Sequence, residues 1–297
     1  MAANRLTGCG TALVTPFTAQ GELDGAALDR LVDWQIAEGV QFLVPCGSTG
    51  EAATMLPYEH RAVVEAVVER AGGRVPVMAG AGSNDTQRAI HTSKEMEAAG
   101  ATHLLHVSPM YNKPPQRGIV AHFRAIAEST RLPIVIYNVP SRTGGNIEAA
   151  TTLELAEVPN IVGVKEASGN LAQVTEILRH RPDHFSVLSG DDALTLPIVA
   201  AGGDGVISVT SNATPRAMST MVQRALEGDL AGARELYLKL TPWMTAAFVE
   251  SNPLPVKAAL AMMGMIENVL RLPLVPLLPA HEGTVRAALQ AAGVEGL

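Results

Sequence analysis

Short apolar runs rich in β-branched residues alternate with longer amphipathic segments along most of this chain. The runs start about 28 residues apart on average, a spacing that suits one strand and one helix per unit. Their length is typical of buried strands rather than of helices. The eight runs begin at Gly10, Gln41, Pro76, His103, Pro133, Ile161, Phe185 and Asp204. The pattern therefore predicts eight consecutive βα units.

The segments between these runs show helical periodicity. In the first of them, Leu28, Leu31 and Val32 recur at spacings of three and four, and charged residues occupy the remaining face. Glycines at positions 72 and 100 stand where helices are expected to end. The three clearest predicted helices span residues 24–38, 57–71 and 85–99.

Apolar strands separated by helices predict a parallel sheet, because parallel neighbours need crossover connections. Eight units favour an α/β fold of the closed (β/α)8 barrel type. A doubly wound sheet is the alternative, but the chain carries no GxxxxGK[ST] motif and no complete GxGxxG motif. The repeat stops near residue 228, and three further helices are predicted at 229–250, 253–264 and 279–293. We predict a catalytic barrel over residues 1–227 and a helical domain over residues 228–297 that packs on it.

Composition excludes several classes of protein. Of the 297 residues, 47% are hydrophobic and 17% charged, which excludes an intrinsically disordered chain. The net charge of −7 and the lack of a Lys/Arg-rich block argue against a nucleic-acid partner. No run reaches about 18 apolar residues, so we expect no membrane span and no signal peptide. Cys9 and Cys46 are far apart and form no CxxC pair, as in a reduced cytoplasmic protein.

One lysine, Lys165, stands inside a predicted strand. Burying its ammonium is costly unless the charge is paired or neutralised. Desolvation lowers the pKa of a lysine from about 10.4, and the neutral amine can attack a ketone to form a Schiff base. The alternative is a structural ion pair with an acid such as Glu166, although adjacent strand residues face opposite sides. The four other lysines lie in predicted helices or a loop, where a solvated ammonium is the ordinary interpretation: Lys94, Lys113, Lys239 and Lys257.

Further polar residues follow the carboxyl ends of the predicted strands, where the active site of an α/β barrel lies. The segment 47–51 (GSTGE) can present backbone N–H groups and hydroxyls to a carboxylate or phosphate, although such a segment is often only a turn. Tyr137 is either a general acid/base or a core tyrosine, and Arg142 either binds a carboxylate or lies on the surface. The full set is Ser48, Thr49, Glu51, Tyr111, Asn112, Tyr137, Arg142, Lys165, Glu166 and Asp191.

Metal ligation is not indicated. His103 and His106 are three positions apart in a strand and therefore face opposite sides. His180 and His184 flank a proline that interrupts helical spacing. The pair Asp191–Asp192 precedes an apolar segment, where a helix cap is the simpler interpretation.

Six motifs, in this order along the chain, closely resemble those of the dihydrodipicolinate synthase/N-acetylneuraminate lyase family. They are Gly47–Glu51, Tyr111–Pro114, Tyr137–Gly144, Gly163–Asn170, Ser189–Asp192 and Gly205–Thr210. The resemblance covers essentially the whole chain. It implies a (β/α)8 barrel with a C-terminal helical domain, usually a homotetramer. It also implies a lysine that forms a covalent Schiff base with pyruvate, with no separate cofactor.

The resemblance also assigns roles to residues of this chain. Lys165 matches the Schiff-base lysine, and Tyr137 matches the tyrosine that transfers protons. Ser48 matches a hydroxyl between that tyrosine and a second one, Tyr111, which a neighbouring subunit contributes. In these enzymes the Schiff base becomes an enamine, whose methyl-derived carbon attacks an aldehyde.

Other matching positions concern substrate binding. Ser48 and Thr49 would hold the carboxylate of pyruvate, and Gly190 and Ile207 would line the same pocket. Arg142 matches the arginine that meets the carboxylate of aspartate semialdehyde, which favours synthesis of 4-hydroxy-tetrahydrodipicolinate for lysine biosynthesis. The alternatives are cleavage of a 2-keto-3-deoxy sugar acid or of N-acetylneuraminate, and a regulatory relative that binds a keto acid without turnover.

The resemblance also implies a departure from the allosteric lysine site of many synthases. Pro57, Arg88 and Met110 stand where the family often has histidine, glutamate and tyrosine, whereas His60 and Asn84 are kept. A positive charge in place of an acidic group repels the ammonium of a lysine effector. We therefore predict weakened feedback by lysine.

Overall fold

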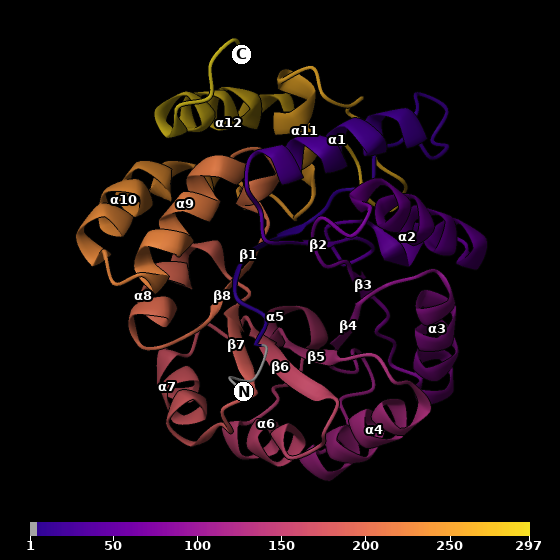
Figure 1. Ribbon diagram of the computed structural model, residues 1–297. Helices are drawn as coiled ribbons and strands as arrows, with labels where there is room; N and C mark the ends of the chain where they lie inside the picture. The colour runs from indigo at the N-terminus through magenta and orange to yellow at the C-terminus, as the bar shows by residue number, and fades with distance from the viewer. Residues whose placement is uncertain (1–4) are drawn as a thin grey trace.

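The computed structural model describes residues 5–297, which form a (β/α)8 barrel with additional C-terminal helices (Figure 1). All seven ladders that pair the strands are parallel, in the order β2-β1-β8-β7-β6-β5-β4-β3. A parallel bridge between Leu43 and Val77 brings the two edges together, so the barrel is nearly closed. The strands are β1 (Gly8–Ala12), β2 (Phe42–Val44), β3 (Met78–Gly80), β4 (His103–Val107), β5 (Ile134–Asn138), β6 (Ile161–Glu166), β7 (Ser186–Ser189) and β8 (Gly205–Ser208). The predicted fold class is confirmed.

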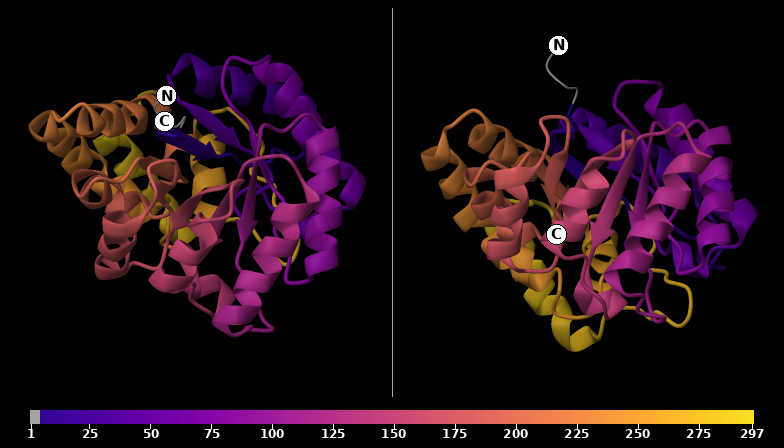
Figure 2. Two further views of the ribbon diagram at one scale, coloured as in Figure 1. Left: turned by 60° about the horizontal axis from the view of Figure 1, so that its bottom comes forward. Right: turned by 90° about the horizontal axis from the view of Figure 1, so that it is seen from below.

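Helices follow the strands and form a ring outside them (Figures 1 and 2). The predicted helices at 24–38, 57–71 and 85–99 are confirmed by α1, α2 and α3. Asp24 caps α1 by accepting from the Ala27 N–H, and Gly72 ends α2 with a φ of 56°, which glycine adopts readily. The helices of the ring are α1 (Gly25–Ala37), α2 (Pro57–Ala71), α3 (Thr86–Ala98), α4 (Gln116–Ser129), α6 (Ala149–Ala156), α7 (Leu171–His180), α8 (Thr195–Ala200) and α9 (Pro215–Leu226), whereas the short α5 (Pro140–Thr143) belongs to the loop after β5.

Three further helices complete the chain: α10 (Leu230–Ala246), α11 (Leu254–Met262) and α12 (Pro279–Ala292). They confirm the helices predicted after residue 228. Helix α10 packs between α9 and α12, so these helices lie against one side of the barrel (Figure 2). The fully buried Trp243 joins α10 to the barrel, because its indole N–H donates at 3.1 Å to the carbonyl oxygen of Thr210, which directly follows β8. The division of the chain into two domains at residue 228 stays a prediction.

Two layers of buried side chains follow from the alternation along the strands. Leu43 on β2 packs outward in the cluster shared with the helices, whereas its neighbours Phe42 and Val44 belong to a separate cluster inside the barrel. The inner cluster also contains Tyr137, Leu188 and Ile207. The interior of the barrel is thus a packed core into which a few polar side chains project.

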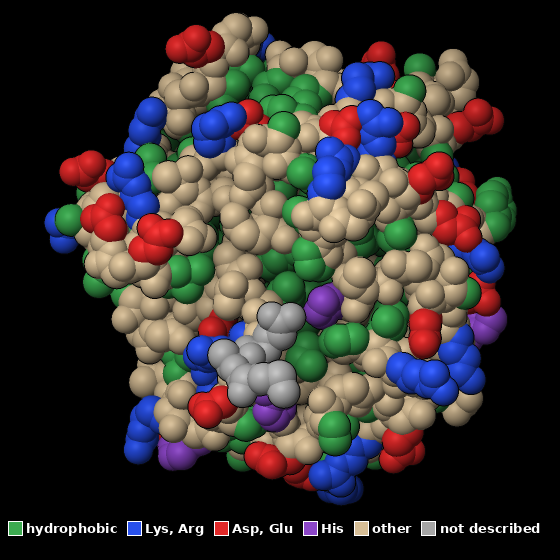
Figure 3. Space-filling model, viewed as in Figure 1, with side chains coloured by type: hydrophobic (Ala, Val, Ile, Leu, Met, Phe, Trp, Pro, Cys, Tyr) green, Lys and Arg blue, Asp and Glu red, His purple; other side chains and the backbone are tan. Residues whose placement is uncertain are grey.

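The surface carries charges of both signs. On the face in Figure 3, lysines and arginines lie interspersed with aspartates and glutamates. Several form exposed ion pairs, such as that of Arg216 with Glu38. Over residues 5–297, no helix combines the length and the apolar composition that crossing a membrane requires.

Candidate active site

Lys165 lies on β6, and its side chain points into the barrel. It is paired in register with Tyr137 on β5 and with Leu188 on β7, both members of the inner cluster. Only 6% of Lys165 is exposed, and its Nζ lies 4.3 Å from the centroid of the Tyr137 ring. The structure thus brings together the predicted lysine and tyrosine.

Burial lowers the pKa of Lys165 from its usual value to about 8. The negative charge of Asp192 opposes this shift, and the positive charge of Arg142 adds to it. A pKa near 8 leaves about a tenth of the amine neutral at pH 7, which is the form that attacks a carbonyl. The environment therefore supplies a nucleophile under ordinary conditions.

Glu166 does not pair with Lys165. Its carboxylate points to the other side of the strand, where it accepts from the Ser168 N–H at 2.7 Å and from the amides of Asn138 and Gln173 at 3.0 and 3.1 Å. The alternative of a structural ion pair between these two neighbours is therefore wrong, because adjacent residues of a strand face opposite sides.

The two aspartates after β7 have different environments. Asp191 accepts from the Ala193 N–H and caps a short 3₁₀ helix, η2 (Asp192–Leu194), which confirms the interpretation as a cap. For Asp192 that interpretation is wrong. This buried carboxylate accepts from the Ser208 hydroxyl at 2.5 Å and from the Val209 N–H at 3.0 Å, and its charge acts on Lys165. The sequence did not distinguish the two aspartates, because the partners of Asp192 lie at the end of β8 and directly after it.

Tyr137 is 8% exposed, and burial raises the pKa of its phenol to about 12, against a smaller opposing effect of Arg142. The phenol therefore stays protonated at neutral pH. A protonated hydroxyl can donate one hydrogen bond and accept another, as a proton-transfer group requires.

Gly190 and Ile207 are the predicted pocket residues. A Cβ placed on Gly190 would be 3.0 Å from Cγ of Lys165 and 2.8 Å from Cβ of Ala167, so a larger residue would displace the lysine side chain. Ile207 is fully buried in the same inner cluster as Tyr137. Gly190 thus lies against Lys165, and Ile207 belongs to the buried cluster that contains Tyr137.

The segment 47–51 follows β2 at the end of the barrel where the other candidate residues lie. Ser48 is exposed, whereas Thr49 is only 3% exposed. The Thr49 hydroxyl accepts a hydrogen bond of 2.8 Å from the side-chain amide of Asn252. The relay from the Ser48 hydroxyl to Tyr137 stays a prediction.

Arg142 lies on the exposed surface of α5, directly after β5, and its Nη2 donates to the carbonyl oxygen of Asn252 at 3.2 Å. Asn252 thus contacts two candidate residues, although it lies 110 positions from Arg142 and 203 from Thr49. No local pattern in the sequence pointed to it. Tyr111 is 90% exposed and adopts a φ of 70°, and its backbone N–H donates to the carbonyl oxygen of Thr143, the residue after Arg142.

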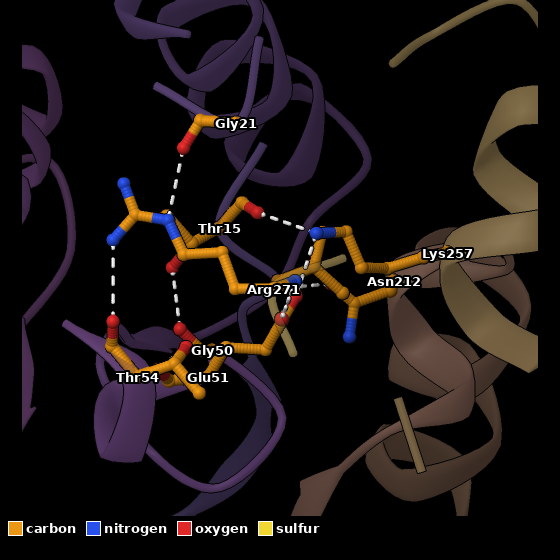
Figure 4. Close-up of polar contacts among 9 residues, drawn as sticks. Thr15, Gly21, Gly50, Glu51, Thr54, Asn212, Lys257 and Arg271 are labelled. Carbon is orange, nitrogen blue, oxygen red and sulfur yellow. Dashed lines mark hydrogen bonds and ion pairs between the residues drawn. The ribbon is translucent and has the colours of Figure 1, made fainter. Parts of the chain in front are cut away.

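The interpretation of Lys257 as a solvated lysine is wrong. Its side chain is fully buried, and its Nζ donates to Glu51 Oε1 at 2.6 Å and to the Thr15 carbonyl at 3.0 Å (Figure 4). The second oxygen of Glu51 accepts from the Arg271 N–H. Because Glu51 lies 206 positions away, the sequence around Lys257 gave no sign of this counter-charge. Glu51 therefore joins the loop after β2 to the C-terminal helices.

Replacing Lys257 with alanine is expected to lower the free energy of unfolding by about 3–5 kcal/mol, because Glu51 would remain buried without its partner. Chemical denaturation of the two proteins at neutral pH measures this difference. Lys94→Ala, which removes an exposed lysine, is the matched control and should stay within about 0.5 kcal/mol of the parent. Equal stability of both variants would show that the pair does not hold the loop.

The histidines of β4 have structural roles. His106 is fully buried, its Nε2 lies 3.1 Å from the Ser93 hydroxyl, and burial lowers its pKa to about 3. His103 faces the opposite side of the strand and bonds to Thr102. Across residues 5–297, no three His, Cys, Asp or Glu side chains are grouped so that they could hold a metal ion.

Known proteins resemble this chain over nearly its full length. Residues 5–292 match the model of the dihydrodipicolinate synthetase family. A 4-hydroxy-tetrahydrodipicolinate synthase of Koribacter versatilis is 52% identical over 291 residues, which cover 98% of this chain and 97% of the relative. The solved dihydrodipicolinate synthase of Thermotoga maritima is 43% identical, with a TM-score of 0.96 and coverage of 98% and 99%. That of Acinetobacter baumannii, solved in complex with pyruvate, is 41% identical, with a TM-score of 0.95 and coverage of 97% and 99%.

Proposed function

The chain belongs to the dihydrodipicolinate synthetase family, and on that premise we propose that it condenses pyruvate with aspartate semialdehyde to give 4-hydroxy-tetrahydrodipicolinate. The enzyme is then a class I aldolase-type lyase of lysine and diaminopimelate biosynthesis. The observation that carries the proposal is the buried Lys165, whose pKa is lowered to about 8 beside the protonated Tyr137.

The reaction proceeds in covalent steps. The neutral amine of Lys165 attacks the keto carbon of pyruvate, and loss of water leaves a Schiff base between Nζ and that carbon. Removal of a proton from the pyruvate methyl group gives an enamine, whose terminal carbon attacks the aldehyde of the second substrate. The protonated imine of the Schiff base is the electron sink, so no separate cofactor is needed. After the new carbon–carbon bond has formed, the amino group of aspartate semialdehyde attacks the imine carbon, which closes the ring and releases the amine of Lys165.

Tyr137 transfers protons during these steps, because its phenol lies against Lys165 and stays protonated at neutral pH. Ser48 continues the relay from its exposed position, and Tyr111 completes it from a neighbouring subunit. The exposure of Tyr111, 90% within one chain, supports a contact across an interface. From the family resemblance, we propose that the enzyme is a homotetramer.

The pyruvate carboxylate binds at Ser48 and Thr49, and Arg142 binds the carboxylate of aspartate semialdehyde. The position of Arg142 on the exposed turn after β5 leaves its guanidinium accessible to an incoming substrate.

The environment of Cys9 and Cys46 supports a reducing compartment such as the cytoplasm, because both are buried free thiols.

Arg142→Ala is expected to lower kcat/KM for aspartate semialdehyde roughly 10- to 100-fold, because a charge-assisted hydrogen-bonded pair is lost. Trapping of pyruvate on the enzyme should change less than about threefold, since pyruvate has its own carboxylate site. A coupled assay and borohydride trapping measure the two effects separately. The control is Arg131→Ala, which removes an exposed arginine elsewhere on the surface. Equal losses with both substrates would contradict the assignment of Arg142.

The choice of second substrate is tested on the wild-type enzyme with aspartate semialdehyde, N-acetylneuraminate and 2-keto-3-deoxygluconate. Of these three compounds, we expect only aspartate semialdehyde, together with pyruvate, to be turned over. Cleavage of a keto-deoxy acid without use of aspartate semialdehyde would place the chain in the aldolase branch. Binding of pyruvate without turnover of any partner would indicate a keto-acid-binding relative.

A further inference from the structure

Asn252 joins two candidate substrate-binding residues that come from different βα loops. It lies between α10 and α11 and is 6% exposed. Its side-chain amide donates to the hydroxyl of Thr49, and its backbone carbonyl accepts from the guanidinium of Arg142. One residue of the C-terminal segment thus touches the groups proposed above for the carboxylates of both substrates.

In the structure, the bond between Asn252 and Thr49 runs from the side-chain amide to the hydroxyl. The amide N–H of Asn252 is a donor only, so the Thr49 oxygen is the acceptor and its own proton points elsewhere. Over residues 5–297, that proton is donated to no protein acceptor, although Thr49 is only 3% exposed. A buried hydroxyl proton without a partner is unfavourable. This free-energy cost is removed when an anion accepts a hydrogen bond from the hydroxyl.

A second link holds the same loop from the same side. Five residues after Asn252, Lys257 forms its buried ion pair with Glu51, at the end of the segment 47–51 (Figure 4). Thr49 is therefore held between a donor to its hydroxyl and an anchor two residues away. The β-branched side chain of Thr49 also has few rotamers, which limits the orientations of its hydroxyl.

We propose that Asn252 is a positioning residue for pyruvate: by donating to the Thr49 hydroxyl, it turns the hydroxyl proton toward the substrate carboxylate. This inference rests on the proposed function, since it takes the ligand of Thr49 to be pyruvate. The backbone carbonyl of Asn252 orients Arg142 independently of the side chain. A change of side chain at position 252 should therefore weaken the binding of pyruvate and leave that of aspartate semialdehyde unchanged.

Asn252→Ala is expected to raise the pyruvate concentration needed for half-maximal borohydride trapping roughly tenfold, because the Thr49 hydroxyl loses its fixed direction. The KM for aspartate semialdehyde should stay within about twofold, since the carbonyl that accepts from Arg142 is kept. Ser251→Ala changes the neighbouring exposed side chain and is the matched control, with no shift expected for either substrate. Equal effects of the two alanine variants, or equal effects on both substrates, would overturn the proposal.

A double-mutant cycle with Thr49→Val tests whether Asn252 acts through the hydroxyl. Once the hydroxyl is absent, Asn252→Ala should add less than about twofold to the pyruvate requirement. Effects that multiply in the double variant would overturn the proposal and assign Asn252 a general structural role.

If Asn252→Ala does not fold, Asn252→Asp keeps the shape but reverses the bond, because a carboxylate accepts from Thr49. We expect a similar or larger loss for pyruvate, and a requirement equal to that of the wild type would overturn the inference. Wild-type enzyme that is not trapped by pyruvate at all would instead refute the proposed function, and this inference with it.

Discussion

Lys165→Met is expected to lower turnover by more than about 10⁴-fold and to abolish covalent trapping of pyruvate, because the variant has no amine to form the Schiff base. Methionine is unbranched and of similar length, so it can keep the packing against Gly190 and Tyr137. Initial rates in the coupled assay, with borohydride trapping in parallel, measure the loss. Residual activity within about tenfold of the wild type would contradict the covalent mechanism.

The same variant should fold at least as well as the wild type. The pKa of Lys165 is about 8 in the folded protein, below that of a lysine in the unfolded chain. The unfolded chain therefore binds more protons, and at pH 7 the buried ammonium lowers stability rather than raising it. Methionine removes this cost. A chemical denaturation curve at pH 7 checks that the loss of activity does not come from loss of structure.

The lowered pKa also sets the pH dependence of trapping in the wild-type enzyme. From pH 8 to pH 7 the initial rate of trapping should fall about fivefold, and below pH 7 each further unit of acidification should reduce it about tenfold, since the neutral amine falls in those proportions. Above about pH 9 the rate should level off. An initial rate that is constant from pH 6 to 8 would show that the amine of Lys165 does not titrate in this range.

Tyr137→Phe is expected to lower kcat by about 10²–10⁴-fold, the usual contribution of a general acid/base group. The ring of phenylalanine fills the same place in the inner cluster, so the packing beside Leu188 and Ile207 is kept. Tyr58→Phe, which removes the hydroxyl of a tyrosine that is 69% exposed, is the matched control and should leave kcat unchanged.

Ser48→Ala extends this test to the proposed relay. Removal of the exposed hydroxyl should also lower kcat, as Tyr137→Phe does. The hydroxyl of Thr49 is retained and can still bind pyruvate. Since both residues act in one relay, the loss in the double variant should be smaller than the product of the single losses. Turnover near that of the wild type in both single variants would show that the proton relay is wrongly assigned.

The barrel was predictable from the sequence because its signals are local. Each strand is an apolar run, and the ends of the first helices are marked by Asp24 and Gly72. The alternation along β6 also placed Lys165 and Glu166 on opposite sides, as the structure has them.

The errors concern contacts between distant segments. Lys257 was interpreted as solvated because its helix looks ordinary, whereas its partner Glu51 comes from the loop after β2. Asn252 was not considered for the same reason, since the residues that it contacts belong to other βα loops. Such pairs depend on how the C-terminal helices pack on the barrel, which periodicity does not specify.

The most direct test of the account is the site of covalent modification. Intact-mass measurement of the wild-type enzyme after pyruvate and borohydride should show one adduct per chain, and peptide mapping should place it on Lys165. An adduct on any other lysine, including the buried Lys257, or the absence of an adduct would contradict the account.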